Sequence, residues 1–165
     1  MNEELGIVKA GLAMVLLGLM FGIALGVTFG VNEDGVKGFI TEEIAAHPEV
    51  HDEKSKTKIW RYAQRAHFHA TGISAYSLGL IILVMFSSMK RKIKSATSIL
   101  IGLSSFYPLA WFVMFLVAPS IGREPAHHHY LTELFTYLGV GGLVTGMLLL
   151  IGNLFFGLLG ETDGA

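Results

Sequence analysis

The chain of 165 residues contains no cysteine. Disulfides, thiolate zinc sites, thiolate-ligated iron–sulfur clusters and covalent c-type haem attachment are therefore excluded. A bound metal would need histidine, carboxylate, methionine or tyrosine ligands. The formal net charge of −1 gives no electrostatic basis for binding nucleic acid.

Charge is missing from four long segments of the chain. Asp, Glu, Lys and Arg are all absent from residues 10–31, 70–89, 95–122 and 134–160. A hydrocarbon core about 30 Å thick is crossed by roughly 20 apolar residues in a helix. Other backbone conformations would leave polar groups unpaired in lipid. We therefore expect an all-α protein, an integral membrane four-helix bundle in the lipid bilayer, forming a single transmembrane domain over residues 1–165.

The expected boundaries follow these runs and the polar residues around them. We predict an extramembrane segment at about 32–57 and helices at about 6–31, 58–89, 95–119 and 129–160. The first run is too long for a secretory signal and is read as a retained helix. Residues 55–65 look helical, and they either lie at the membrane surface or begin the second membrane helix.

The short connection at residues 89–94 carries four cations and no acidic residue. The positive-inside rule gives most weight to short loops and places this connection in the cytoplasm. The opposite side carries seven Lys or Arg against five, so the total count points the other way. We give the short loop more weight, and expect a prokaryotic inner (cytoplasmic) membrane with the histidine-bearing face extracytoplasmic.

Glycines recur at intervals of four in the first helix, at Gly18, Gly22, Gly26 and Gly30. This spacing places them on one face, where small residues allow a neighbouring helix to approach closely. The alternative is a groove that admits a flat cofactor such as a porphyrin beside Gly22 and Gly26. In the third helix, Pro108 predicts a kink, because proline removes a backbone donor.

All seven histidines fall on one side of the predicted bundle, because the connections between helices 1 and 2 and between helices 3 and 4 share that side. They are His47, His51, His67, His69, His127, His128 and His129. Neutral imidazole is a common ligand of transition metals and of haem iron. The set therefore indicates a metal or haem site, although boundary histidines without a ligand are also common.

Helical geometry separates His67 from His69, because residues two apart point about 200° from each other. His69 lies deeper and is followed by Gly72, so we favour it as an axial haem ligand. Across the bundle, His129 precedes Glu133 by about one turn. A carboxylate just inside the apolar boundary is usually paired or functional, and Glu133 is suited to orient a ligating imidazole.

The remaining candidates follow from the same chemistry. Arg61, Arg65 and Arg123 lie on the histidine side and are suited to bind haem propionates. The alternative is a non-haem copper, zinc or iron site, whose ligands would come from Glu133 and five histidines. Those histidines are His67, His69, His127, His128 and His129.

Two short stretches resemble the catalytic subunits of haem–copper oxidases and nitric oxide reductases. Residues 65–70, RAHFHA, are similar to the start of a helix in which a histidine near the outer surface ligates a low-spin haem b. Residues 126–130, AHHHY, resemble the paired histidines that hold copper in that group. The resemblance covers about a fifth of the chain, and those subunits have many more helices. It implies a reduced four-helix relative that keeps a haem and passes electrons.

We expect a membrane haem b protein, or the haem-bearing subunit of a respiratory complex. Its axial ligands would be His69 and one of the three consecutive histidines, preferably His129, with His67 and His128 as further cofactor-binding candidates. Electrons would come from a quinol, with Glu133 as the catalytic proton acceptor. The alternatives are a non-haem metal protein and a structural accessory subunit whose glycine-lined helices dock on other membrane subunits or on a second copy.

Overall fold

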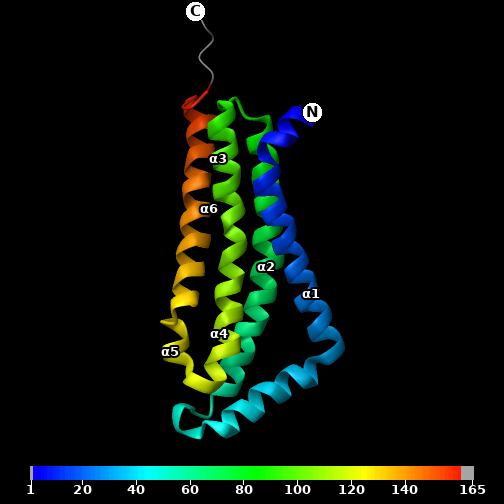
Figure 1. The fold of residues 1–165 in the computed structure, drawn as a ribbon, viewed down its shortest axis with the longest axis vertical. Coiled ribbons are helices and arrows are strands. Elements are labelled where there is room, and N and C mark those ends of the chain that lie inside the picture. The colour runs from blue at the N-terminus through cyan, green and yellow to red at the C-terminus, as the bar shows by residue number, and fades with distance from the viewer. Residues whose placement is uncertain (1, 161–165) are drawn as a thin grey trace, which may run out of the picture.

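Residues 2–160 are described by the computed structural model and form helices and their connections, without a β-strand. Four antiparallel helical columns stand side by side, and both ends of the described chain lie at the same end of the bundle (Figure 1). The columns are α1 (Asn2–Ala46), α2 (Ser55–Phe86), the run Arg91–Ile121, and α6 (Tyr130–Phe156). All four are long and apolar enough to cross a membrane, as the charge-free runs predicted.

The first helix extends further than the sequence indicated. α1 continues past residue 31 to Ala46, and non-helical angles at Asn32 (φ −140°, ψ 45°) divide it into two parts. The second part turns across the lower end of the bundle in Figure 1. Ile40 is fully buried there, against a core that includes Tyr62 and Phe115. The segment predicted as extramembrane is therefore largely an amphipathic helix, which we call the α1 arm (residues 33–46).

A short connection follows, containing the 3-10 turn Pro48–Val50. α2 then begins at Ser55, so residues 55–65 start the second long helix, one of the two alternatives considered. Asp52 stabilises this start, because its carboxylate accepts hydrogen bonds from the Lys54 backbone N–H (3.1 Å) and from the Ser55 hydroxyl (2.8 Å). These bonds fix the turn that leads into α2.

The third column consists of α3 (Arg91–Gly102), a 3-10 turn at Leu103–Phe106, and α4 (Tyr107–Ile121). The turn ends two residues before Pro108. Pro108 lies in the first turn of α4, where a missing N–H removes no helical bond. The helix ends at Gly122, whose φ of +86° favours glycine. A short helix, α5 (Arg123–His127), then leads into α6.

Glycines allow the columns to approach closely, as their spacing predicted. A Cβ atom on Gly22 would lie 2.9 Å from the backbone nitrogen of Thr71 in α2. One on Gly139 of α6 would lie 2.5 Å from the backbone nitrogen of Tyr107 in α4. Both distances are far below ordinary carbon contacts, so these helix crossings depend on the missing side chains.

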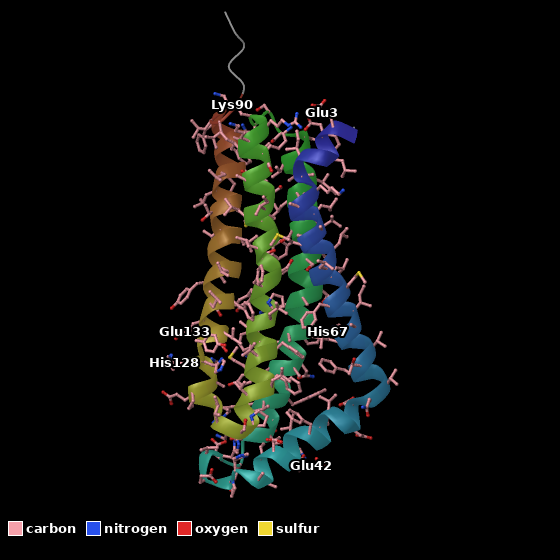
Figure 2. All side chains as sticks on the ribbon, in the orientation of Figure 1. Glu3, Glu42, His67, Lys90, His128 and Glu133 are labelled. Carbon is pink, nitrogen blue, oxygen red and sulfur yellow. The ribbon has the colours of Figure 1, made fainter. Side chains whose placement is uncertain are left out.

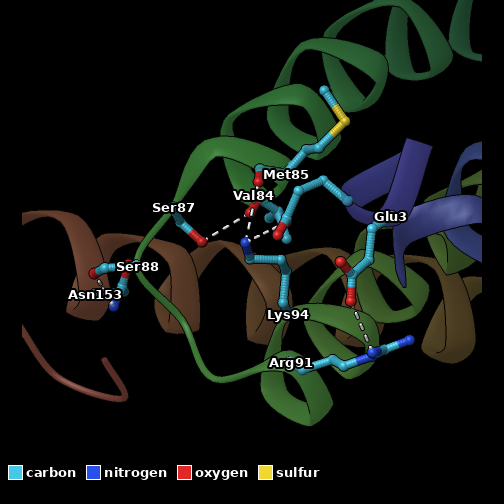
Figure 3. Close-up of polar contacts among 9 residues, drawn as sticks. Glu3, Val84, Met85, Ser87, Ser88, Arg91, Lys94 and Asn153 are labelled. Carbon is cyan, nitrogen blue, oxygen red and sulfur yellow. Dashed lines mark hydrogen bonds and ion pairs between the residues drawn. The ribbon is translucent and has the colours of Figure 1, made fainter. Parts of the chain in front are cut away.

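Ion pairs and hydrogen bonds connect the columns at the end opposite the histidines. The Lys94 ammonium donates to Glu4 (2.6 Å) and to the Met85 carbonyl (3.1 Å), as part of the network in Figure 3. Nearby, Arg91 donates to Glu3 at 3.1 Å. These contacts attach the start of α1 to the α2–α3 connection.

Candidate functional site

The histidines gather at the end of the bundle that carries the α1–α2 and α4–α6 connections. This follows from the antiparallel order of the four columns. They do not form one group, however. Figure 2 shows His67 on the side of α1 and His128 across the width of the bundle, near α5 and Glu133. Each histidine therefore has its own surroundings.

A set of aromatic and basic side chains from three helices surrounds His69. α2 contributes Tyr62, Arg65 and His69, which its helical period places on one side. Tyr107 and Trp111 lie one turn apart in α4, and α5 contributes its last residue, His127. We call these six residues the histidine–aromatic cluster.

Trp111 lies at the centre of this cluster. Its ring centroid is 5.8 Å from that of His69 and 6.5 Å from that of His127. Tyr107 also contacts His69, with ring centroids 5.2 Å apart. The guanidinium of Arg65 lies 4.6 Å from the Trp111 ring centroid, in cation–π geometry. Imidazoles from two different helices therefore contact a single indole.

The indole nitrogen of Trp111 is an unsatisfied donor. Trp111 Nε1 is buried and has no hydrogen-bond partner among residues 2–160. A buried N–H without an acceptor costs about 1–3 kcal/mol, and such a group calls for an explanation. One explanation is that the acceptor belongs to a ligand that binds in the cluster.

His127 is held by Tyr62. The phenolic oxygen of Tyr62 lies 2.9 Å from His127 Nε2, and the two rings meet edge to face. Partial burial of the imidazole lowers the pKa of His127 below its usual value of 6.5, and the positive charge of neighbouring His128 lowers it further. His127 therefore favours the neutral form, which is the form that binds a metal.

The environment of His67 is different. His67 Nδ1 donates to the Gly22 carbonyl at 2.8 Å, and its ring fills the space beside Gly26. On the same face of α1, Gly22 faces Thr71 and Ala70 of α2. The groove proposed for a porphyrin at Gly22 and Gly26 is thus filled by α2 side chains, and the glycines serve helix packing instead.

Glu133 pairs with a different histidine from the one expected. His128 Nδ1 lies 3.3 Å from Glu133 Oε1, whereas the sequence suggested a contact with His129. His129 lies against Tyr130, with ring centroids 4.9 Å apart, and its buried Nδ1 has no partner in the described chain. The difference arises because residues 128 and 129 form a non-helical turn before α6.

The three candidate arginines are separated as well. Arg65 belongs to the cluster, and Arg61 is exposed on α2 one turn earlier. Arg123 donates to Asp52 at 2.8 Å, which joins α5 to the start of α2. A hydrogen bond from Ser55 lowers the pKa of Asp52, and the positive charge of Arg123 lowers it further.

A polar cavity of about 340 Å³ opens between α2 and α5. Its walls are Tyr62, Arg123, Glu124, His127 and His128. Because Tyr62 and His127 also belong to the cluster, the cavity gives polar molecules a route to one side of it.

The predicted metal ligands do not converge. No three His, Asp or Glu side chains within residues 2–160 are grouped so as to hold a metal ion. The five histidines proposed for copper, zinc or iron are therefore not brought together. His47 and His51 have structural contacts: His47 Nδ1 donates to the Glu43 carbonyl (3.1 Å) and His51 Nε2 to the Pro119 carbonyl (2.7 Å).

Sequence reasoning missed Tyr62, Tyr107 and Trp111 as members of the site. A signal was present, because Tyr107 and Trp111 are four residues apart, and Tyr62 precedes His69 by two turns. No family model, curated protein or solved structure matches the chain. Its function is therefore inferred from the chemistry of the cluster itself.

Proposed function

We propose that this chain is an integral membrane protein that binds a b-type haem at the histidine–aromatic cluster and passes electrons. His69 and His127 would hold the haem iron. The observation that carries the proposal is the convergence of these two imidazoles on Trp111, whose buried N–H lacks an acceptor within the described residues. When bound, a haem supplies one-electron exchange at a potential that its ligands and surroundings set.

The residues of the cluster suit each part of a haem. Imidazoles are the usual axial ligands of b-type haem iron, and Tyr107 and Trp111 supply flat apolar surfaces for a macrocycle. The guanidinium of Arg65 is a donor suited to a propionate. Among the three consecutive histidines, His127 fits better than His129, because His127 is the one in contact with Trp111.

The membrane assignment rests on the four helices of spanning length and on the distribution of charge. The connection between α2 and α3 and the first turn of α3 carry Lys90, Arg91, Lys92 and Lys94, which favours a cytoplasmic location for this end of the bundle. The histidine–aromatic cluster would then lie near the extracytoplasmic face.

Two observations disfavour the alternative functions. The described residues lack a grouping of three metal-binding side chains, which a non-haem site would use. Several of the glycines offered as docking surfaces for other subunits are used within the bundle, because Gly22 faces α2, and Gly139 and Gly142 face the third column, whereas Gly30 and Gly141 are open. The catalytic role of Glu133 stays a prediction.

Absorption spectroscopy tests the haem proposal. The protein is extracted in mild detergent and recorded oxidised and then reduced with dithionite. We expect a Soret band and a reduced α band in the wild type, with loss of the band in His69→Ala and a shifted or weakened band in His127→Ala. His47→Ala is the matched control at the same end of the bundle and should keep the wild-type spectrum.

Two results would refute the proposal. One is a colourless wild-type protein that has been expressed with added haem precursor. The other is a His69→Ala spectrum identical to that of the wild type. Far-ultraviolet circular dichroism of each variant, which should remain strongly helical, separates loss of haem from loss of fold.

A further inference from the structure

The first three turns of α2 carry four positively charged side chains on one face. Residues 54, 58, 61 and 65 are spaced by four, three and four, which places them within about 60° of one another around the helix axis. The residue before α2 has helical backbone angles and so continues the same spiral. The four residues are Lys54, Lys58, Arg61 and Arg65, and all of them are exposed. We call this set the basic stripe.

No carboxylate within residues 2–160 forms an ion pair with the basic stripe. The cations that do form ion pairs are Lys37, Arg91, Lys94, Arg123 and His128. The Asp52 carboxylate lies close enough to interact with the charge of Lys58, but it is already paired with Arg123 at 2.8 Å. Like charges four residues apart destabilise a helix. A partner with negative charge would therefore remove a cost that the stripe imposes on the fold.

Negative charge gathers on a different surface at the same end of the bundle. The α1 arm carries Glu33, Asp34, Glu42 and Glu43. It packs against another side of α2, where Ile59 is fully buried in the same core as Ile40. The two signs of charge are thus separated, with the basic stripe on the open face of α2. Such a separation orients a charged partner as it approaches.

The length of the basic stripe indicates a partner in water instead of a lipid. Lys54 and Arg65 are 11 residues apart, about 16 Å along the helix axis, and α2 runs along the long axis of the bundle (Figure 1). The headgroup layer on each side of the hydrocarbon core is about 5–8 Å thick, so lipid phosphates reach about half of the stripe. The part around Lys54 and Lys58 extends beyond them, where a water-soluble protein can bind.

The inner end of the basic stripe belongs to the histidine–aromatic cluster. The guanidinium of Arg65 lies 4.6 Å from the ring centroid of Trp111. Trp111 in turn contacts the imidazoles of His69 and His127. A protein bound along the stripe would therefore lie next to the cluster.

We propose that the basic stripe is the docking face for a water-soluble electron-transfer protein whose cofactor edge is surrounded by carboxylates. Four cations on one open helix face match such an acidic surface and increase the rate at which it associates. One electron is exchanged between the partner's cofactor and the haem, and one of them is oxidised as the other is reduced. The docking depends only on the charge of the stripe, whereas the electron exchange rests on the proposed haem function.

An acidic probe protein tests the docking. The full chain is reconstituted in nanodiscs of phosphatidylcholine and immobilised, and the soluble domain of cytochrome b5, an acidic haem protein, is passed over it in biolayer interferometry. We expect binding whose association rate constant falls steeply as the salt concentration rises, because salt screens exposed charges. No binding at low salt, or binding that does not change with salt, would overturn the proposal.

Lysine variants assign the binding to one face of α2. Lys54→Gln and Lys58→Gln should each lower the association rate constant about threefold at low salt, and the double variant about tenfold, because each removes one steering charge. Lys56→Gln is the matched control, because Lys56 is exposed in the same turn but lines a cavity on the side of the arm, with Ile40. It should lower the rate less than either stripe variant. Equal rates for the double variant and Lys56→Gln would refute the assignment.

A lipid measurement distinguishes an acidic protein from acidic lipids as the partner. The wild type and the double variant are extracted from membranes that contain phosphatidylglycerol, and the bound lipid is counted by mass spectrometry. We expect equal amounts in the two samples. Loss of phosphatidylglycerol from the double variant, with unchanged association of cytochrome b5, would replace the protein partner by a lipid surface.

A further variant separates this proposal from the haem proposal. His69→Ala should bind cytochrome b5 at the wild-type rate even where the Soret band is lost. Charge-dependent binding to a wild type that has no Soret band would refute the haem alone. A Soret band in a wild type without charge-dependent binding would refute the docking face alone.

Discussion

The contact between α6 and α4 gives a sharp test of the packing. A Cβ atom on Gly139 would lie 2.5 Å from the Tyr107 nitrogen and 2.9 Å from its Cα atom. An ordinary contact is about 3.4 Å or more, so Gly139→Ala requires the two helices to separate by about 1 Å. The obstacle is backbone and cannot rotate away, which places the cost near the upper end of the 1–3 kcal/mol typical of overpacking.

We therefore expect Gly139→Ala to lower the free energy of unfolding by about 3 kcal/mol, roughly a hundredfold in the unfolding equilibrium constant. Gly141→Ala is the matched control in the same helix, because nothing lies within 4 Å of its Cβ position. That variant should differ from the wild type by less than about 0.5 kcal/mol, as is usual at surface positions.

The assay is reversible unfolding by sodium dodecyl sulfate in mixed micelles, followed by circular dichroism and by tryptophan fluorescence. Gly26→Ala should lower the free energy of unfolding by about 1 kcal/mol, between the values for the other two variants. A Cβ atom there would lie 2.7 Å from the end of the His67 ring, which is a side chain that can turn. Equal midpoints for Gly139→Ala and Gly141→Ala would show that α6 and α4 do not cross as described.

Two further predictions concern charge. Because the pKa of His127 is lowered in the folded protein, acidification of the haem-free protein through pH 6.5 and below should destabilise the fold, whereas stability above that pH is unaffected by this group. His127→Gln should remove this part of the pH dependence of the thermal midpoint. The same dependence of the midpoint on pH in the variant and the wild type would refute the role of His127. At the other end of the bundle, Glu4→Gln should lower the free energy of unfolding by about 2 kcal/mol, because it leaves the Lys94 ammonium without its partner, and only 8 % of that side chain is exposed. Lys94→Met should lower it by less than about 1 kcal/mol, because the Glu4 side chain that it leaves is 44 % exposed. The reverse order in the same unfolding assay would contradict the burial of Lys94.

The four columns could be predicted because each long apolar helix corresponds to a long run without charged residues in the sequence. The α1 arm could not be predicted in the same way, because Glu33 and Asp34 end the charge-free run. Its helical continuation depends on packing, with Ile40 buried against the base of α2 and α4. Apolar residues at 36, 39, 40 and 44 do have helical spacing, and that pattern was the available signal.

The candidate site was predicted in part. His69 was placed correctly within its helix, because its neighbours follow the regular period of α2. The sequence could not indicate which of the three consecutive histidines faces the cluster. α5 ends at His127 and the chain then turns, so helical spacing does not give the directions of His128 and His129. Such a turn is fixed by contacts distant in sequence, here the bond between Tyr62 and His127. The pairing of Glu133 with His128 depends on the same turn.

The α1 arm has a consequence for how the protein responds to its surroundings. It carries four carboxylates and one lysine, and Ile40 attaches it to the same core as Tyr62. In the proposed membrane the arm lies at headgroup level, where anionic lipids repel it and zwitterionic lipids do not. Any lifting of the arm removes packing from Tyr62, which holds His127. The lipid composition of the surrounding leaflet should thus change the position of Tyr62 and His127, although no lipid contacts these two side chains.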